Sequence, residues 1–238
     1  MKYESRIRTA MRLLAGGAGV AIGTYAACVG VAWFRFGNAS PISTDDRDDV
    51  LDRFMPVYDV VERHRVRIAA PAAITLTAAK EHDLREPRLI RAIFKVREVA
   101  LGATPDDHRA PTGLLAEALS LGWGILAESP AHEVVVGAIT KPWEANVTFH
   151  AVAPDQFEPF WQRGYVKIAW NLRVDAVGES DAIFRTETRA IAMGAVARAK
   201  FRRYWAFASP GVSLIRSLSL VSLKRDAERR ADVASSLW

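Results

Sequence analysis

An uncharged stretch near the N-terminus constrains this chain more than any other feature. "LLAGGAGVAIGTYAACVGVAWF" runs from Leu13 to Phe34 without a charged side chain. As a helix it would extend about 33 Å, enough to cross a bilayer core of about 30 Å. A helix buried in a soluble domain usually shows a polar face, and this stretch shows none. Trp33 lies at its end, and Arg12 and Arg35 lie just outside it, as at membrane–water interfaces. We therefore predict a transmembrane helix here.

Two alternatives remain open for the same stretch. A cleavable signal peptide has a shorter apolar stretch of about 7–15 residues, although Ala26 and Ala27 resemble a cleavage site. "YAAC" resembles a bacterial lipoprotein signal with Cys28 as the acylated residue. Tyr25 departs from that pattern, and the chain stays apolar after Cys28. Because Cys28 is the single cysteine, an intramolecular disulfide is excluded.

Small residues recur every four positions within the predicted span, at Ala15, Gly19, Gly23 and Ala27. Such a stripe lets two spans approach closely, which gives a homodimer through the span as one interpretation. The other interpretation is that Gly and Ala are common in spans and nothing pairs. The basic flank at 1–12 carries more Lys and Arg than the residues after the span. The positive-inside rule then favours a single-pass membrane protein with its domain outside the cytoplasm.

Charge is unevenly distributed along the chain. The net charge of +5 is made up of +4 in residues 1–36, +7 in residues 198–230 and −6 in the rest. Both ends are basic and the body is acidic, so the sequence does not describe one basic face for nucleic acid. We expect no nucleic-acid partner.

Periodicity predicts the order of the remaining elements. A polar, acidic linker is expected over 35–57, a folded domain over 58–230 and a tail over 231–238. The domain should begin with a strand over 61–68 and continue with helices, a hairpin from Trp123, and a strand over 146–153. Strict alternation predicts strands over 165–177 and 182–192, each with an apolar and a charged face. A long final helix follows, with a kink or break at Pro210.

Three stretches of the domain resemble the SRPBCC superfamily, which includes the START, Bet v 1-like and polyketide cyclase/dehydrase-like domains. They are "HRVRIAAPAA", "WNLRVDAVGESDAIFRTETRAIA" and "AKFRRYWAFASPGVSLIR". The resemblance covers roughly residues 58–225. It implies an α+β helix-grip fold, with a curved antiparallel sheet wrapped on a long C-terminal helix and an apolar cavity between them. It also implies binding of lipids, sterols, polyketides or other hydrophobic molecules, with cyclase activity in some members.

Aromatic residues and two threonines on the predicted inward faces are the candidate cavity lining. An apolar pocket with few polar groups orients a ligand, although the same aromatic side chains are equally expected in a plain core. The candidates are Trp123, Phe149, Trp170, Phe184, Thr186, Thr188, Phe201, Tyr204 and Trp205. His64 and His150 lie on predicted strands and are the weaker candidates for acid–base chemistry. No metal-ligand spacing and no cofactor motif is found, so we expect neither a metal nor a cofactor.

The last helix carries a basic face with two interpretations. It holds the domain against anionic lipid headgroups, or it is simply solvated. Its residues are Arg198, Lys200, Arg202, Arg203, Arg216, Lys224 and Arg225. The sequence thus predicts a membrane-anchored domain that binds membrane lipid or another hydrophobic small molecule. The alternatives are a cyclase- or hydrolase-type enzyme, for which no complete catalytic set is found, and a protein-interaction domain without a ligand.

Overall fold

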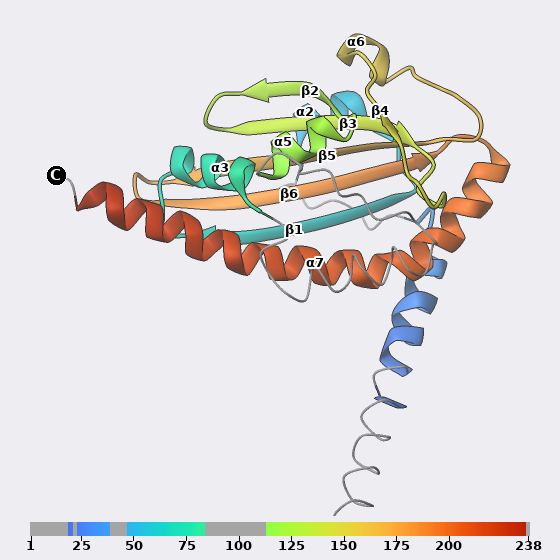
Figure 1. The fold of residues 1–238 in the computed structure, drawn as a ribbon, viewed down its shortest axis with the longest axis horizontal. Coiled ribbons are helices and arrows are strands. Elements are labelled where there is room, and N and C mark those ends of the chain that lie inside the picture. The colour runs from blue at the N-terminus through green and yellow to red at the C-terminus, as the bar shows by residue number, and fades with distance from the viewer. Residues whose placement is uncertain (1–18, 21–22, 39–46, 84–112, 237–238) are drawn as a thin grey trace, which may run out of the picture.

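An antiparallel sheet organises the chain, which is described here by a computed structural model covering residues 19–20, 23–38, 47–83 and 113–236. The strands follow the order β1-β6-β5-β3-β2, and β4 pairs with β3. Their bounds are β1 Val60–Ile68, β2 Gly124–Ser129, β3 Glu133–Thr140, β4 Phe149–His150, β5 Val166–Val177 and β6 Asp181–Ala192. Figure 1 shows the long helix α7 (Ala195–Ser235) running along one side of this sheet. The predicted α+β architecture, with an antiparallel sheet and a long C-terminal helix, is confirmed.

The alternation seen in the sequence places the apolar side chains of β5 and β6 on the face toward α7. Trp170 pairs with Thr188, and Val174 pairs with Phe184. Because successive side chains in a strand point to opposite faces, Asn171 and its charged neighbours face the other way. We call the side toward α7 the inner face and the opposite side the outer face.

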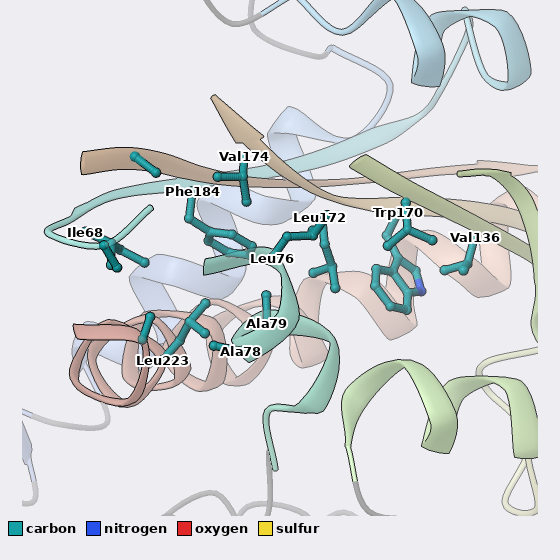
Figure 2. Close-up of a cluster of buried hydrophobic side chains, with 14 of the residues drawn as sticks. Ile68, Leu76, Ala78, Ala79, Val136, Trp170, Leu172, Val174, Phe184 and Leu223 are labelled. Carbon is teal, nitrogen blue, oxygen red and sulfur yellow. The ribbon is translucent and has the colours of Figure 1, made fainter. Parts of the chain in front are cut away.

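Helices cover both faces of the sheet. On the inner face, α3 (Ala72–Glu81), α5 (Leu114–Ser120) and α7 enclose the main hydrophobic core. Figure 2 shows Leu76 of α3 and Leu223 of α7 meeting Phe184 and Leu172 of the sheet. On the outer face, α2 (Asp49–Phe54) and α6 (Pro154–Phe157) enclose a second cluster that contains Leu51 and Phe157.

The final helix passes through Pro210 without a break. Figure 1 shows α7 changing direction between its orange first part and its red last part, as expected when proline removes a backbone donor. Its last part also covers the edge strand β1. Lys224 Nζ donates to the Arg67 carbonyl at 2.8 Å, and Glu228 Oε1 accepts from the Ala69 N–H at 3.0 Å. Side chains of α7 therefore satisfy backbone groups at the end of an edge that would otherwise be open for pairing.

The transmembrane helix was predicted at the N-terminus, and the structure does not support that placement. Among the described residues, the helix that is long and apolar enough to cross a membrane is α7. The core helix of a soluble protein meets the same criteria, and α7 packs against the sheet through buried Phe201 and Leu223. The predicted span at 13–34 is helical over 23–35, while residues 13–18 and 21–22 lie outside the described residues.

Two other predictions change in part, and a third lies outside the described residues. Within the predicted linker, 39–46 lies outside the described residues, but α2 packs Leu51 against the sheet with its side chain fully buried. The strand expected over 146–153 is reduced to the two residues of β4. The helix expected over 86–102 falls outside the described residues.

Candidate ligand site on the inner face of the sheet

The predicted cavity-lining aromatic residues form two separate clusters. Trp123 lies with its ring centroid 4.9 Å from that of Phe149 and 6.0 Å from that of Trp170, at one end of the inner face. Phe201 contacts Tyr204 and Trp205, with centroids 6.4 and 6.0 Å apart, near the start of α7.

Phe184 belongs to neither aromatic cluster and lies 2% exposed in the main core, where Figure 2 shows it beside Leu172. Phe201 is similarly enclosed, at 1% exposed. These two side chains act as packing groups in the structure. A lining role for the other aromatic residues remains a prediction.

The two predicted threonines lie side by side on β6 and are bridged from α7. Arg216 donates from Nη1 to Thr186 Oγ1 at 3.2 Å and from Nη2 to Thr188 Oγ1. The Thr186 hydroxyl donates onward to the Asn171 carbonyl at 2.8 Å. Trp170 stands opposite Thr188 on the neighbouring strand. The structure thus places a cation and two hydroxyl groups in an otherwise apolar wall.

Two titratable residues of β1 complete this cluster. Glu62 pairs with Thr188 across the strands, and His64 pairs with Thr186. Directly opposed Cβ atoms in an antiparallel pair lie about 4.5–5.5 Å apart, so both side chains border the threonines. His64 Nε2 lies 3.5 Å from Glu62 Oε2, and this nitrogen is buried without a hydrogen-bond partner. We call Glu62, His64, Thr186, Thr188 and Arg216 the inner polar cluster.

Burial lowers the pKa of Arg216, and the negative charge of Glu62 acts in the opposite direction. The guanidinium of arginine keeps its positive charge in proteins. Arg216 was predicted to lie on the basic face of the final helix. That prediction is wrong, because the structure turns this side chain toward β6. The signal that could have found it was its position among apolar neighbours, because Leu220 and Leu223 of the same helix pack against the main core.

A groove of about 630 Å³ opens between β1 and α7 beside the inner polar cluster. His64 and Val66 of β1 line one wall, and Leu220 and Val221 of α7 line the other. Charged residues form the rest of its lining, namely Arg65, Lys224, Arg225 and Glu228, together with Ser217. His64 connects the groove to the cluster, because it lines the groove and also stands opposite Thr186.

The outer face carries a different, largely buried polar network. The sequence predicted charged faces on these strands, and the structure buries part of them, since Arg189 is 0% exposed and Asn171 is 1% exposed. Arg189 donates to Glu187 at 2.6 Å and to Asp52 of α2 at 2.5 Å. A pocket of about 190 Å³ adjoins this network and is lined mainly by charged residues. The covering helix α2 explains the burial, and these contacts fasten α2 to the sheet.

The other predicted residues fall as follows. Gly19, Gly23 and Ala27 are exposed in the described part of the N-terminal helix, with open space around the two glycines, and Ala15 lies outside it. The homodimer through this stripe stays a prediction. His150 is exposed, with Nε2 3.4 Å from Thr148 Oγ1. Over the described ranges, no three His, Cys, Asp or Glu side chains gather as a metal site would require.

Comparisons with known proteins find solved structures that are similar in fold at low sequence identity. No protein-family model and no curated protein matches the chain. The hypothetical protein jhp0584 from Helicobacter pylori is similar in structure, at 8% identity and a TM-score of 0.40. The match covers 79% of this chain and 99% of that one.

Two enzymes are more distantly similar. Zhui aromatase/cyclase from Streptomyces sp. R1128 matches 72% of this chain and 94% of its own, at 15% identity and a TM-score of 0.27. Norcoclaurine synthase from Thalictrum flavum matches 78% and 97%, at 11% identity and a TM-score of 0.25. At such scores the architecture has to be judged from this chain's own topology, in which a curved antiparallel sheet is wrapped on a long C-terminal helix.

Proposed function

We propose that this protein is a membrane-associated domain that binds a lipid or another hydrophobic small molecule between its sheet and α7. The observation that supports this best is the groove between β1 and α7. It combines apolar walls at Val66 and Leu220 with a polar end at His64, as small-molecule sites do. Its volume is in the range of about 300–1,000 Å³ that is usual for ligand pockets.

Association with a membrane is supported by two adjoining apolar surfaces. Phe207, Leu214 and Val221 are exposed at every seventh residue of α7 and therefore share one face of the helix. Tyr25, in the helical stretch 23–35, donates from its hydroxyl to the Phe207 carbonyl at 2.7 Å. Figure 1 shows this blue stretch projecting from the body on the side of α7 away from the sheet. Val221 lines the groove as well, so a ligand would reach the groove from the membrane side.

A neutral fluorescent probe tests ligand binding. The full chain in detergent micelles is titrated with N-phenyl-1-naphthylamine, and saturable enhancement of its emission is expected. Leu220→Asp places a carboxylate in the groove wall and should weaken binding at least about tenfold. Leu214→Asp, with the same change on the outward face, is the matched control. Absence of saturable binding by the folded wild-type chain would reject a ligand-binding function.

A second measurement tests the membrane surface. An environment-sensitive dye on Leu214→Cys, in a Cys28→Ala background, should shift to the blue when the protein is reconstituted into vesicles containing an anionic lipid. The same dye on Val57→Cys should not shift, because exposed Val57 lies beside α2, on the outer side of the sheet. Equal shifts at both sites would contradict the assigned surface.

An enzyme of hydrolase type is the second candidate, favoured by the 3.5 Å approach of Glu62 and His64 on the inner face. A carboxylate beside an imidazole can orient the ring, which suits a general base. Hydrolysis of p-nitrophenyl decanoate by the wild type, lost in His64→Gln, would support this function. A hydrolysis rate equal to the rate in buffer without protein would count against an enzymatic function.

A further inference from the structure

Arg216 is a partly buried cation on which the charge of Glu62 acts without a direct ion pair. Among the residues the structure describes, the guanidinium bonds only to the hydroxyl oxygens of Thr186 and Thr188, and it forms no ion pair. Other arginines of the sheet region, such as Arg63 and Arg189, are each paired with Glu187. Charges removed from water are normally paired, because the desolvation cost of an uncompensated charge is large. Arg216 therefore differs from these arginines, because its guanidinium bonds to hydroxyl groups and to no carboxylate directly.

Hydrogen-bonding capacity remains free at the same place. A guanidinium has more N–H donors than the two used on the threonines, and it presents them in a planar fork. The Thr188 hydroxyl accepts from Arg216, which leaves its own proton for another acceptor. His64 Nε2 is buried without a hydrogen-bond partner on the adjacent strand. An acceptor with two oxygens would satisfy these groups.

From these contacts we infer that the inner polar cluster binds the ionised carboxylate of an amphiphile whose alkyl part occupies the apolar groove. The inference rests on the proposed ligand-binding function and specifies the chemical class of the ligand. Arg216 pairs with the carboxylate, and Thr188 donates to it. The apolar walls at Val66, Leu220 and Val221 receive the chain.

A carboxylate fits this cluster better than a phosphate monoester. Arg216 supplies the fixed positive charge of the cluster, and Glu62 contributes a negative charge nearby. A carboxylate adds one negative charge beside Glu62, whereas a dianionic phosphate adds two and calls for additional cations. Lys224 and Arg225 also line the groove. They follow Leu220 and Val221 along α7 and are not among the contacts of Arg216.

The test compares two ligands of equal chain length. Decanoate and decanol are each titrated against bound N-phenyl-1-naphthylamine in the full chain, in the same detergent and at neutral pH. The wild type should prefer decanoate by about tenfold or more, the size expected for a hydrogen-bonded charge pair. Arg216→Gln should lose this preference while it still binds decanol. Arg203→Gln, which removes the same charge from the exposed side of α7, should keep it, and Arg216→Lys should restore part of it.

Each other result has a definite meaning. If the probe binds but decanoate and decanol compete equally, the carboxylate site is wrong and the ligand-binding function stands. If the preference for decanoate survives in Arg216→Gln, the assigned cation is wrong. Tighter binding of decyl phosphate than of decanoate would overturn the choice of a carboxylate. If the probe itself does not bind to folded protein, both the inference and the proposed function fail.

Discussion

The side-chain amide of Asn171 donates to Glu133 Oε1 at 2.8 Å on the outer face of the sheet, beneath the start of α2. The same amide group donates to Asp48 Oδ2 at 2.5 Å, and Asp48 Oδ1 caps α2 through the Leu51 N–H. One asparagine thus joins two carboxyl groups that are only 2% and 3% exposed. This arrangement buries the carboxyl groups of Glu133 and Asp48 together. Their protonation should therefore control how the free energy of unfolding depends on pH.

Burial, together with the hydrogen bond to Asp48, raises the pKa of Glu133 to about 8. The unfolded carboxyl has its ordinary pKa of 4.5, so between these values the folded state holds a proton that the unfolded state has released. Stability should therefore fall as pH rises through that window. Glu133→Gln, which keeps a donor toward Asp48, should flatten the dependence and unfold at a higher urea concentration at about pH 8.

Urea denaturation at several pH values measures this effect. The expected gain of Glu133→Gln near pH 8 is about 1 kcal/mol or more, since one pKa unit corresponds to about 1.4 kcal/mol. Glu179→Gln, in the exposed turn between β5 and β6, is the matched control and should follow the wild type. If stability depends on pH as steeply in Glu133→Gln as in the wild type, another group is responsible for the pH dependence.

Arg189→Ala should destabilise the fold by about 3–5 kcal/mol. The substitution leaves Asp52 without its partner and Glu187 with Arg63 alone, and it removes the bond to the Met55 carbonyl at 2.8 Å. Losing one partner of a buried ion pair leaves the other charge uncompensated. Hydrogen exchange should report faster opening of α2. Arg203→Ala, on the exposed side of α7, should change stability by less than about 0.5 kcal/mol, and a comparable loss there would refute the mechanism.

Gly137→Ala should destabilise the sheet by about 1–3 kcal/mol through overpacking. A Cβ at this position would lie 2.5 Å from Phe157 Cε2 and 2.6 Å from Leu126 Cδ1. Both neighbours belong to the hydrophobic cluster on the outer face of the sheet, where close packing leaves their side chains little room to move. The double variant Gly137→Ala with Phe157→Leu should recover part of the loss, as measured by thermal unfolding. No recovery would indicate that the backbone, and not the ring, limits this position.

Asp59→Ala should loosen the junction between the N-terminal helix and α7. The Asp59 side chain accepts from the Ala192 N–H at 3.0 Å and from Arg198, and its carbonyl accepts from the Gly37 N–H at 2.7 Å. Removing the carboxylate leaves the Ala192 N–H unpaired, which costs about 1–3 kcal/mol. Amide exchange around Ala192 and in the helical stretch 23–35 should accelerate. Arg198→Ala should have a smaller effect, because Arg198 is half exposed.

Local patterns in the sequence predicted most of the sheet. Strands β5 and β6 have alternating side chains over 12 residues each, and this period of two requires an extended chain with two chemically distinct faces. The strand at β1, the hairpin of β2 and β3, and the long final helix were found in the same way. The weak strand at β4 was overestimated, because a few alternating residues do not show whether a partner strand is present.

What lies against each face was decided by tertiary packing. Alternation placed Arg189 and Asn171 opposite the core, but only the position of α2, more than a hundred residues away in sequence, shows that they are buried. Charge alone placed Arg216 on a basic face toward lipid headgroups or solvent, whereas the approach of α7 to β6 turns it onto two threonines. The sequence by itself determined the strands, their faces and the terminal helix, since these follow from local periodicity. The candidate site required the structure, because Glu62, Thr188 and Arg216 meet only when three distant segments pack together.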